Sequence, residues 1–236
     1  LWIFYAHASL VMVFLTVIAC VPLIYKTIKM EEAYDIKVEK ESLLMKEHTR
    51  VLSFLMFLFL GIVCSVAFWY VVLPISMHST LFSIQTGTIS SINQQVTGNA
   101  VGGGILLKIF FNNMRVLVFC LLFSFFYGVG AIFILTWNAS VIGVAIGNFI
   151  RTNVSKYLGY FGVVPLAVFR YMTHGVLEIG AYFIAGLAGG IISVAIIRHD
   201  FGTKNFEHVL LDSVDLILVS ILLLVVAALV EVFITP

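Results

Sequence analysis

The fold class follows from residues 51–73, which read VLSFLMFLFLGIVCSVAFWYVVL and contain no charged side chain. A helix needs about 20 mostly apolar residues to cross a bilayer, and this stretch has that length. The same criterion predicts further spanning helices at 2–24, 116–137, 175–197 and 213–234, and the ambiguous stretch 139–173 supplies a short sixth span. The sequence therefore predicts an all-α fold, a polytopic transmembrane bundle of about six helices that forms one integral membrane domain over 1–236.

The composition excludes a water-soluble protein. Of the 236 residues, 61% are hydrophobic and 11% are charged, and the mean hydropathy is +1.12. Soluble domains have about 45–50% apolar and about 25% charged residues. The net charge of +1 gives no basic field, so we expect no nucleic-acid partner. The three cysteines, Cys20, Cys64 and Cys120, lie dispersed in apolar runs, which favours neither a disulfide framework nor a metal site, and we expect no cofactor.

The stretch 139–173 is predicted to be the irregular part of the bundle. It is apolar at 139–150, polar from Arg151 to Lys156, and apolar again from Tyr157. We interpret 157–173 as a short sixth span and 139–150 as a short helix or a re-entrant segment. Irregular backbone at membrane depth is tolerated where protein surrounds it.

Lysine and arginine residues predict which loops are cytoplasmic. With six spans and both ends outside, ten of them fall on one side: six in 25–50, two in 138–156 and two in 198–211. Only Lys108, Arg115 and Arg170 fall on the other side. We therefore expect a multi-pass protein of the cell membrane whose 25–50 loop is cytoplasmic. A five-span arrangement, with 139–173 wholly re-entrant, would place 198–211 outside and weaken this asymmetry.

Two stretches are predicted to lie outside the hydrocarbon core. The 25–50 segment contains six acidic and six basic residues. This balance fits a solvated linker, a helical hairpin extension or a partner-binding surface. The 74–113 segment begins with a stretch rich in Ser, Thr, Gln, Asn and Gly, which favours a flexible external loop. It ends in ILLKIFFNN, which favours an interfacial amphipathic helix.

The sharpest candidate site contains Arg170, His174 and Glu178, with Gly175 between them in the chain. Steps of four residues keep side chains along one stripe of a helix. Ionisable groups in membrane helices are expensive to place in lipid and mark candidate functional sites. Three interpretations remain open: a polar cluster that holds helices together, a pocket for a ligand or partner, and a catalytic site or proton relay. Neither HExxH nor GxSxG occurs, so nothing supports a zinc protease or a serine hydrolase.

Other polar residues in the predicted spans have simpler interpretations. His7 and Glu231 fall near outer helix ends, where they could join the candidate site. Asp212 and Asp215 open the last span, where negative charge complements a helix N-terminus.

Two runs of sequence carry a family resemblance. They are FFNNMRVLVFCLLFSFFYGVGAIFILTWNASVIG at 110–143 and THGVLEIGAYFIAGLAGG at 173–190. In this order they resemble the stage II sporulation protein M-like family of integral membrane proteins. The positions that match the family's recurring polar positions are Asn113, Arg115, Asn138, His174, Gly175 and Glu178.

The resemblance implies an all-α membrane protein with five or six spans and no agreed biochemical activity. In spore-forming bacteria, the protein that gives the family its name belongs to a membrane complex with cell-wall hydrolases. Relatives also occur in organisms that never sporulate, so the name alone does not define the role.

The matched residues predict one polar pocket, or partner-binding site, near the outer leaflet. In it, Asn113 and Arg115 at the start of one span would meet Arg170, His174, Gly175 and Glu178 on another. Small residues and one asparagine are predicted to serve packing instead. The structural brace consists of Asn138, Gly128 and Gly130, and the spacing of Gly143/Gly147 and Gly186/Gly190 favours close packing of helices, mostly within the chain.

We therefore expect a non-enzymatic membrane scaffold or complex component. Its partners would be the lipid bilayer and other membrane or envelope proteins, with a homo-oligomer left open. The first alternative is a transport-related, permease-like subunit or channel that uses the Arg170/His174/Glu178 pocket. The second is a membrane-embedded enzyme that uses His174 and Glu178.

Overall fold

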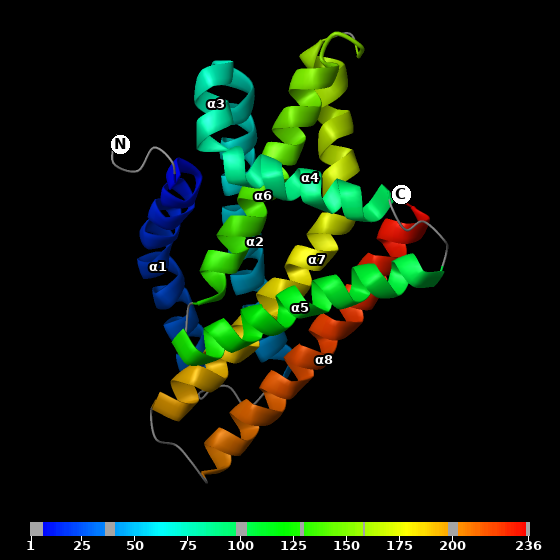
Figure 1. Cartoon of the computed structure of the whole chain (residues 1–236). Coiled ribbons are helices and arrows are strands. Elements are labelled where there is room, and N and C mark those ends of the chain that lie inside the picture. Colours follow the sequence, from blue (N-terminus) through cyan, green and yellow to red (C-terminus); the bar gives the residue numbers. More distant parts are fainter. Residues whose placement is uncertain are drawn as a thin grey trace.

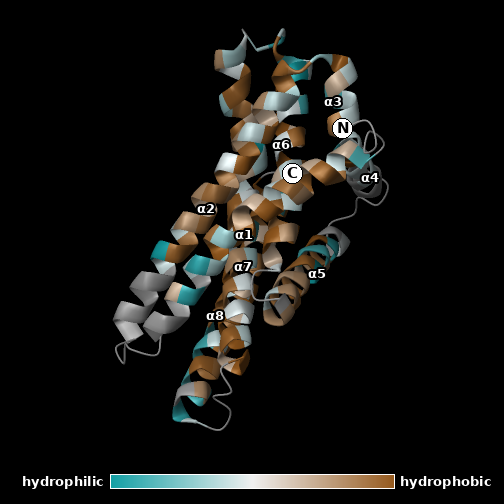
Figure 2. Cartoon of the chain, turned by 90° about the vertical axis from the view of Figure 1, so that its left-hand side faces the viewer, coloured by the Kyte–Doolittle hydropathy of each residue, from teal (hydrophilic) through white to brown (hydrophobic). Residues whose placement is uncertain are grey.

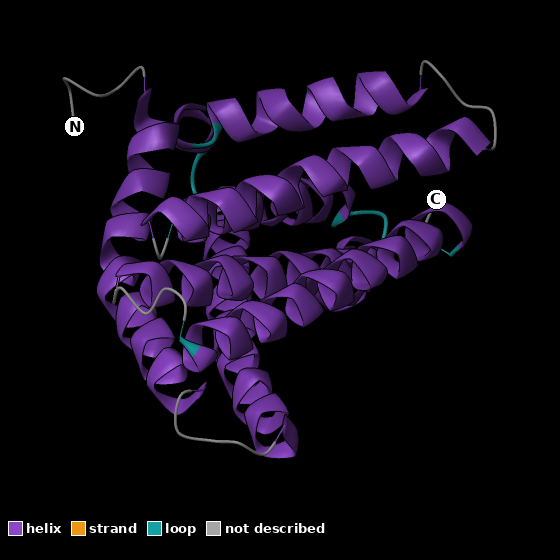
Figure 3. Cartoon of the chain, turned by 90° about the horizontal axis from the view of Figure 1, so that it is seen from below, coloured by secondary structure: helices purple, strands orange, loops and turns teal. Residues whose placement is uncertain are grey.

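The structure is a computed structural model, which describes residues 7–35, 41–97, 103–127, 130–157, 159–197 and 203–234. In these ranges the chain is helical and contains no strand (Figure 3). The helices are α1 (Ala8–Asp35), α2 (Glu41–Val72), α3 (Ile75–Leu81), α4 (Ser83–Thr97), α5 (Gly103–Tyr127), α6 (Ala131–Asn153), α7 (Tyr160–Ile197) and α8 (Lys204–Phe233).

Helix α7 forms the common wall between two groups of helices (Figure 1). On one side, α2 packs along α6, α1 lies beside both, and the short helices α3 and α4 contact α1. On the other side, α5 and α8 pack against α7 and against each other. Figure 1 shows that α5 and α8 cross the molecule obliquely, whereas α1, α2 and α6 run more nearly upright. A polar site between α5, α7 and α8 is therefore separated from the α1–α2–α6 group.

Within the described residues, six helices are long and apolar enough to cross a membrane, which confirms the predicted all-α, six-span fold. The candidate spans are Ala8–Thr27, Thr49–Val72, Leu106–Phe126, Ala131–Asn153, Gly175–Ile197 and Phe206–Phe233. Figure 2 shows hydrophobic residues along most of these helices, with hydrophilic residues mainly toward helix ends, among them the start of α8. The span in α7 is 72% buried inside the molecule, whereas those in α5 and α8 are each 22% buried. Helix α7 is thus central, and α5 and α8 present most of their surface to the surroundings.

The predicted span 116–137 is wrong, because it combines parts of two helices. Helix α5 ends at Tyr127 and α6 begins at Ala131. The residues that separate them in the sequence are Gly-Val-Gly, which carry no charge and leave the hydropathy high. Hydropathy therefore marks no boundary there.

The predicted irregular segment is confined to a short connection. Helix α6 is continuous from Ala131 to Asn153, so 139–150 is an ordinary part of a span and is not re-entrant. The stretch 157–173 is not a separate span, because α7 runs without interruption from Tyr160 to Ile197 and includes Pro165 near its start. Residues 154–159 connect the two helices.

Arg151 lies within α6, although the polar run that begins at this residue predicts a break in the helix. Its Nη1 donates hydrogen bonds to the carbonyl oxygens of Tyr70 (3.2 Å) and Leu73 (2.9 Å), with Val71 at 3.5 Å. The last carbonyls of a helix lack partners within the helix, so this guanidinium satisfies the C-terminal end of α2. Because Arg151 finds acceptors on α2, its charge does not end α6.

The same contact corrects the predicted sidedness of two basic residues. Because Arg151 touches the C-terminal end of α2, the end of α6 lies opposite the 25–50 segment, which joins α1 to the start of α2. Arg151 and Lys156 were predicted on the 25–50 side, and this prediction is wrong. The prediction for the other eight of the ten basic residues is unchanged.

The two predicted loops are largely helical. Helix α1 continues to Asp35 and α2 begins at Glu41. Of the forms expected for the 25–50 segment, the helical extension of both helices therefore fits the structure. Residues 75–97 form α3 and α4, in contrast to the expected flexible loop. Their hydroxyls bond to carbonyls of the preceding turn, as Thr86 does to Phe82 and Thr88 to Ile84, both at 2.9 Å. Residues 105–113, expected to form a separate interfacial helix, are the first part of α5, and from Leu106 onward they belong to a candidate span.

Glycines allow α6 to approach α2 closely. A Cβ added at Gly143 would lie 2.8 Å from Cβ of Val66, and one added at Gly147 would lie 2.8 Å from Cβ of Tyr70. Real Cβ atoms do not approach so closely, and small residues serve this purpose between membrane helices. The expected internal packing of the Gly143/Gly147 pair is confirmed.

Candidate functional site

The candidate functional site is a polar network that joins three spanning helices. Nδ2 of Asn113, on α5, donates a hydrogen bond to Oε1 of Glu178, on α7, over 2.5 Å. Glu178 in turn shares a side-chain hydrogen bond with Glu231, on α8. Each helix of the α5–α7–α8 group thus contributes one polar side chain to the same place.

Tight packing surrounds this network. Tyr182, one turn after Glu178 on α7, is 3% exposed and lies close enough to interact electrostatically with Glu178, Glu231 and Cys120. Cys120, on α5, is fully buried, and Asn113 is 9% exposed. Because most of these groups are shielded from solvent, their mutual interactions occur in a medium of low dielectric constant.

The network can serve two chemical purposes. Two carboxyl groups form a hydrogen bond only when a proton lies between them, as in other closely paired carboxylic acids. The Glu178–Glu231 contact joins α7 to α8, and paired carboxyl groups of this kind can share and release a proton. The Asn113 amide fastens α5 to the same pair.

The structure brings together only part of the predicted pocket. Asn113 and Glu178 are in contact, but Arg170 lies elsewhere, exposed, with its guanidinium 5.9 Å from the centre of the Phe149 ring on α6. Two helical turns separate Arg170 from Glu178, a rise of about 12 Å, which explains why one stripe meets two different neighbours. Arg115 is also outside the network, because it is exposed on the side of α5 away from Asn113.

The remaining candidate positions contribute in different ways. His174 lies within α7, but its side chain is outside the described part of the chain. Gly175 has no atom within 4 Å of an added Cβ, so no close approach requires a glycine there.

The predicted brace is also only partly described. Asn138 lies within α6 and donates to the carbonyl of Ile134 at 2.8 Å, so it bonds to its own helix and does not brace an irregular segment. Gly130 immediately precedes α6, and an added Cβ would lie 2.2 Å from the carbonyl oxygen of Phe123. Gly128 is outside the described residues.

Sequence reasoning missed Tyr182 and left open whether Glu231 joins the candidate site. Glu231 is the one charged residue in the last twenty-one, 216–236, which is a usable signal that it has a partner. Tyr182 follows Glu178 by four residues and so shares its helix face. Neither pattern identifies the partner helix, which depends on how α5, α7 and α8 pack.

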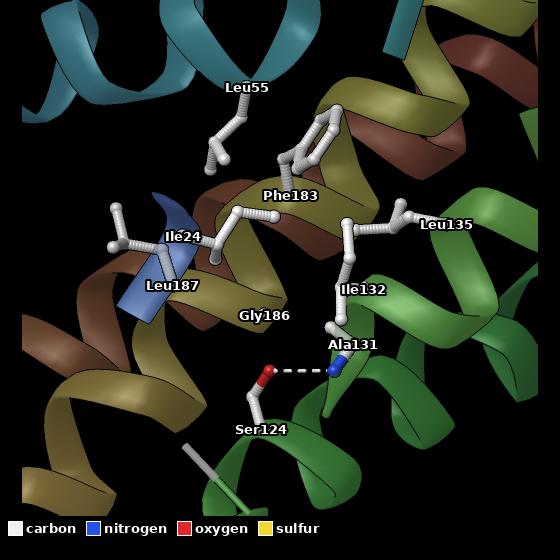
Figure 4. A pocket seen from close by; sticks show the side chains of 9 residues that line it. All are labelled: Ile24, Leu55, Ser124, Ala131, Ile132, Leu135, Phe183, Gly186 and Leu187. Carbon is white, nitrogen blue, oxygen red and sulfur yellow. Dashed lines mark hydrogen bonds between the residues drawn. The ribbon is translucent and has the colours of Figure 1, made fainter. Parts of the chain in front are cut away.

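The described cavities lie away from this network. One of about 30 Å³ is lined by Ile24, Leu55, Ser124, Ala131, Ile132, Leu135, Phe183, Gly186 and Leu187 (Figure 4). Its walls are apolar except at Ser124, whose Oγ accepts a hydrogen bond from the backbone N–H of Ala131 at 3.3 Å. Pockets that bind solutes are about 300 Å³ or larger, so this cavity is a packing void.

Within the described residues, no group of three or more His, Cys, Asp or Glu side chains could hold a metal ion. Cys20, Cys64 and Cys120 are all free thiols. The polar network therefore remains the feature of the described structure that calls for a functional explanation.

Comparison with known proteins identifies relatives of the chain. The family described as Stage II sporulation protein M matches residues 51–236. An uncharacterized protein of Methanocaldococcus jannaschii is 30% identical over 176 residues, which cover 70% of this chain and 94% of that protein. No solved structure matches.

Proposed function

Because the chain belongs to the stage II sporulation protein M family, we propose that it is a non-enzymatic integral membrane component that assembles with other membrane or envelope proteins. The observation that carries this proposal is the polar stripe on the outer face of α5. The stripe consists of Lys108, Asn112 and Arg115, which follow one another at helical spacing and are exposed. All three lie within the candidate span Leu106–Phe126.

Arg115 carries its charge on the outer face of a spanning helix, where it needs a partner. A charged side chain in the hydrocarbon core costs about 2.5–3.5 kcal/mol or more, so such residues usually face protein or a polar cavity. A second membrane protein that covers the stripe would remove this cost for Arg115. A lipid-facing α5 would retain it, apart from what the side chain gains by reaching toward the headgroups.

We place the protein in the cell membrane with the 25–50 segment in the cytoplasm. Eight of the thirteen Lys and Arg residues lie on that side once Arg151 and Lys156 are moved to the other end. An excess of basic residues is typical of cytoplasmic loops.

Photo-cross-linking from the stripe tests the assembly role. A photoreactive residue at Phe119, which follows Arg115 by one turn and is 47% exposed, reports what lies against this face in native membranes. The control position is Phe57, which is 74% exposed in the α2 span. We expect a stoichiometric membrane-protein adduct, identified by mass spectrometry, at Phe119 and not at Phe57. Lipid adducts alone at both positions would reject the assembly role.

The alternative is a transport-related role, which the carboxyl pair favours. Carboxyl groups buried in spanning helices often serve ion or proton pathways. In this case the relevant groups are Glu178 and Glu231, while Arg170 lies outside the network. Purified protein in liposomes would then show proton or ion flux that Glu178→Gln abolishes, whereas Asn112→Leu would leave it unchanged. Equal leakage in liposomes with and without protein would reject this alternative.

A further inference from the structure

The most exposed face of the spanning bundle is formed by α5 and α8. The spans of both helices are 22% buried, compared with 56% in α6 and 72% in α7. The two helices contact each other and cover one side of α7. A partner that packs against this face would therefore contact both helices at once.

Arg115 is the unusual residue on this face. It is exposed in the α5 span, and none of the described carboxylates forms an ion pair with it. Asn113, two residues earlier, points to the opposite side and bonds to Glu178. The same turn of α5 thus carries one polar side chain to the interior and one charged side chain to the exterior.

The polar network sets the depth of Arg115 relative to two carboxyl groups. Asn113 contacts Glu178, and Glu178 contacts Glu231, so these three residues lie at one level of the bundle. Arg115 lies about 3 Å further along α5, and less than that in depth because α5 is oblique. Glu178 and Glu231 each keep part of their surface exposed. A partly exposed residue with an acidic side chain, Glu231, therefore lies at the depth of Arg115.

From this arrangement we infer that a second copy of this chain packs against the α5–α8 face and inserts its Arg115 beside Glu231. Two copies inserted in the same orientation are related by an axis along the membrane normal, which keeps every residue at its own depth. In such a dimer, Arg115 of each copy meets Glu231 of the other, as a self-complementary interface requires. This inference rests on the assembly role proposed above and names the partner.

The partner copy would complete the polar site. Asn112 is exposed beside Arg115, and its Nδ2 lies 3.5 Å from Oδ1 of Asn113, so the stripe and the buried network are neighbours on α5. A guanidinium offers several donors and carries a fixed positive charge, which suits a carboxyl pair that holds one proton. Pairing would shield the Arg115 charge of one copy from lipid. It would also place a positive charge beside the Glu178–Glu231 pair of the other copy.

The first test measures the dimer dissociation constant of purified protein in lipid nanodiscs or mild detergent. We expect Arg115→Leu to raise this constant about tenfold or more, as loss of one partner of a shielded charge pair does. Lys156→Leu is the matched control, because it removes an exposed positive charge at the connection between α6 and α7. An unchanged dissociation constant for Arg115→Leu, or a monomeric wild-type protein, would overturn the inference.

Charge exchange between copies provides a second test. Protein with Arg115→Glu and protein with Glu231→Arg should each fail to form homodimers, whereas a mixture of the two should form heterodimers, since both ion pairs are then restored. Thermal unfolding of each variant alone verifies that it is folded. If Glu231→Arg does not fold, Glu231→Gln replaces it and should weaken the dimer about tenfold or more. A mixture of folded variants that forms no heterodimer would overturn the inference.

Cross-linking at Phe119 separates this inference from the broader assembly role. An adduct between two copies supports both. A stoichiometric adduct with a different membrane protein overturns the second-copy inference and leaves the assembly role standing. Adducts with lipid alone overturn both.

Discussion

At the scale of single residues, two neighbouring asparagines have opposite surroundings. Asn113 is 9% exposed and donates to Glu178, whereas Asn112 is exposed on the outer face of α5. We expect Asn113→Leu to lower the free energy of unfolding by about 1–3 kcal/mol, because it leaves a shielded carboxyl oxygen without its donor. Asn112→Leu should change it much less. Unfolding in detergent with increasing denaturant measures both, and equal losses would contradict a specific role for the Asn113 bond.

Arg151 offers a second test at this scale. Its guanidinium bonds to carbonyl oxygens of Tyr70 and Leu73 at the end of α2. Arg151→Met should destabilise the fold by about 2–3 kcal/mol, since these hydrogen bonds are charge-assisted and the carbonyls lose their donor. Arg170→Met is the control, because the contact of Arg170 with the Phe149 ring is worth only about 0.5–1 kcal/mol. Comparable melting temperatures for the two variants would argue against capping by Arg151.

His78 makes the stability of the α2–α3 corner depend on pH. Burial, and then the nearby charge of Arg151, lower the pKa of His78 below its usual value. The folded protein therefore favours the neutral ring, so this stabilisation is present above the unfolded pKa of about 6.5 and is lost as the pH falls below it. We expect the melting temperature to fall less between pH 7.5 and pH 5.5 in His78→Gln than in the wild type. Parallel decreases in both proteins would exclude His78 as a source of the pH dependence.

Sequence reasoning identified the important polar residues better than their partners. Spacing along a helix puts Arg170 and Glu178 on one stripe, but the expected pocket combines Asn113 and Arg115, which lie two residues apart and face different sides of one turn of α5. It does not say which helix lies over each position. Arg170 meets Phe149 on α6 while Glu178 meets Asn113 and Glu231, because different neighbours cover different turns of α7. This information belongs to tertiary packing.

At the scale of helices, close contact between α2 and α6 depends on Gly147. An added Cβ would lie 2.8 Å from Cβ of Tyr70, whereas at Gly175 it would meet nothing within 4 Å. We expect Gly147→Ala to destabilise the protein by about 1–3 kcal/mol, because the two helices must move apart. Gly175→Ala should be neutral, or stabilising by up to about 1 kcal/mol, because alanine favours helix. Denaturant unfolding of both variants measures the change in the free energy of unfolding. No change for Gly147→Ala would show that α2 and α6 adjust to the added methyl group without cost.

The helices themselves were predictable where hydropathy changes sharply. The spans in α2 and α8 were recognised because polar segments precede them. The junction between α5 and α6 was missed because uncharged residues separate the two helices. The sequence predicts the end of α6 too early, because a charged residue at position 151 suggests that the apolar helix ends there. In the structure, carbonyl oxygens of α2 accept hydrogen bonds from Arg151. Hydropathy measures transfer to lipid, so it marks neither an uncharged connection between two helices nor a charged side chain that bonds to a neighbouring helix.

At the scale of the whole molecule, the structure predicts which ends of the bundle share a side. Lys29 lies just beyond the α1 span and Lys156 lies between α6 and α7, and both are exposed. In a background with Cys20, Cys64 and Cys120 replaced by alanine, Lys29→Cys and Lys156→Cys should react with a membrane-impermeant thiol reagent from opposite faces. Labelling of intact and opened cells, or of vesicles of both orientations, measures this. Labelling of both from one face would restore the arrangement first expected from the sequence.

The bond between Glu178 and Glu231 also has a consequence for how the protein is made. The ribosome releases α5 and α7 before α8, so Glu178 enters the membrane with Asn113 at hand but without its carboxyl partner. A chain that stops short of α8 leaves an acidic side chain in the bilayer that only one amide satisfies. Insertion of α8 thus marks the moment at which a nascent chain loses a feature that membrane proteases and insertion chaperones can recognise. Truncated chains would be degraded faster than the full-length protein for this reason alone.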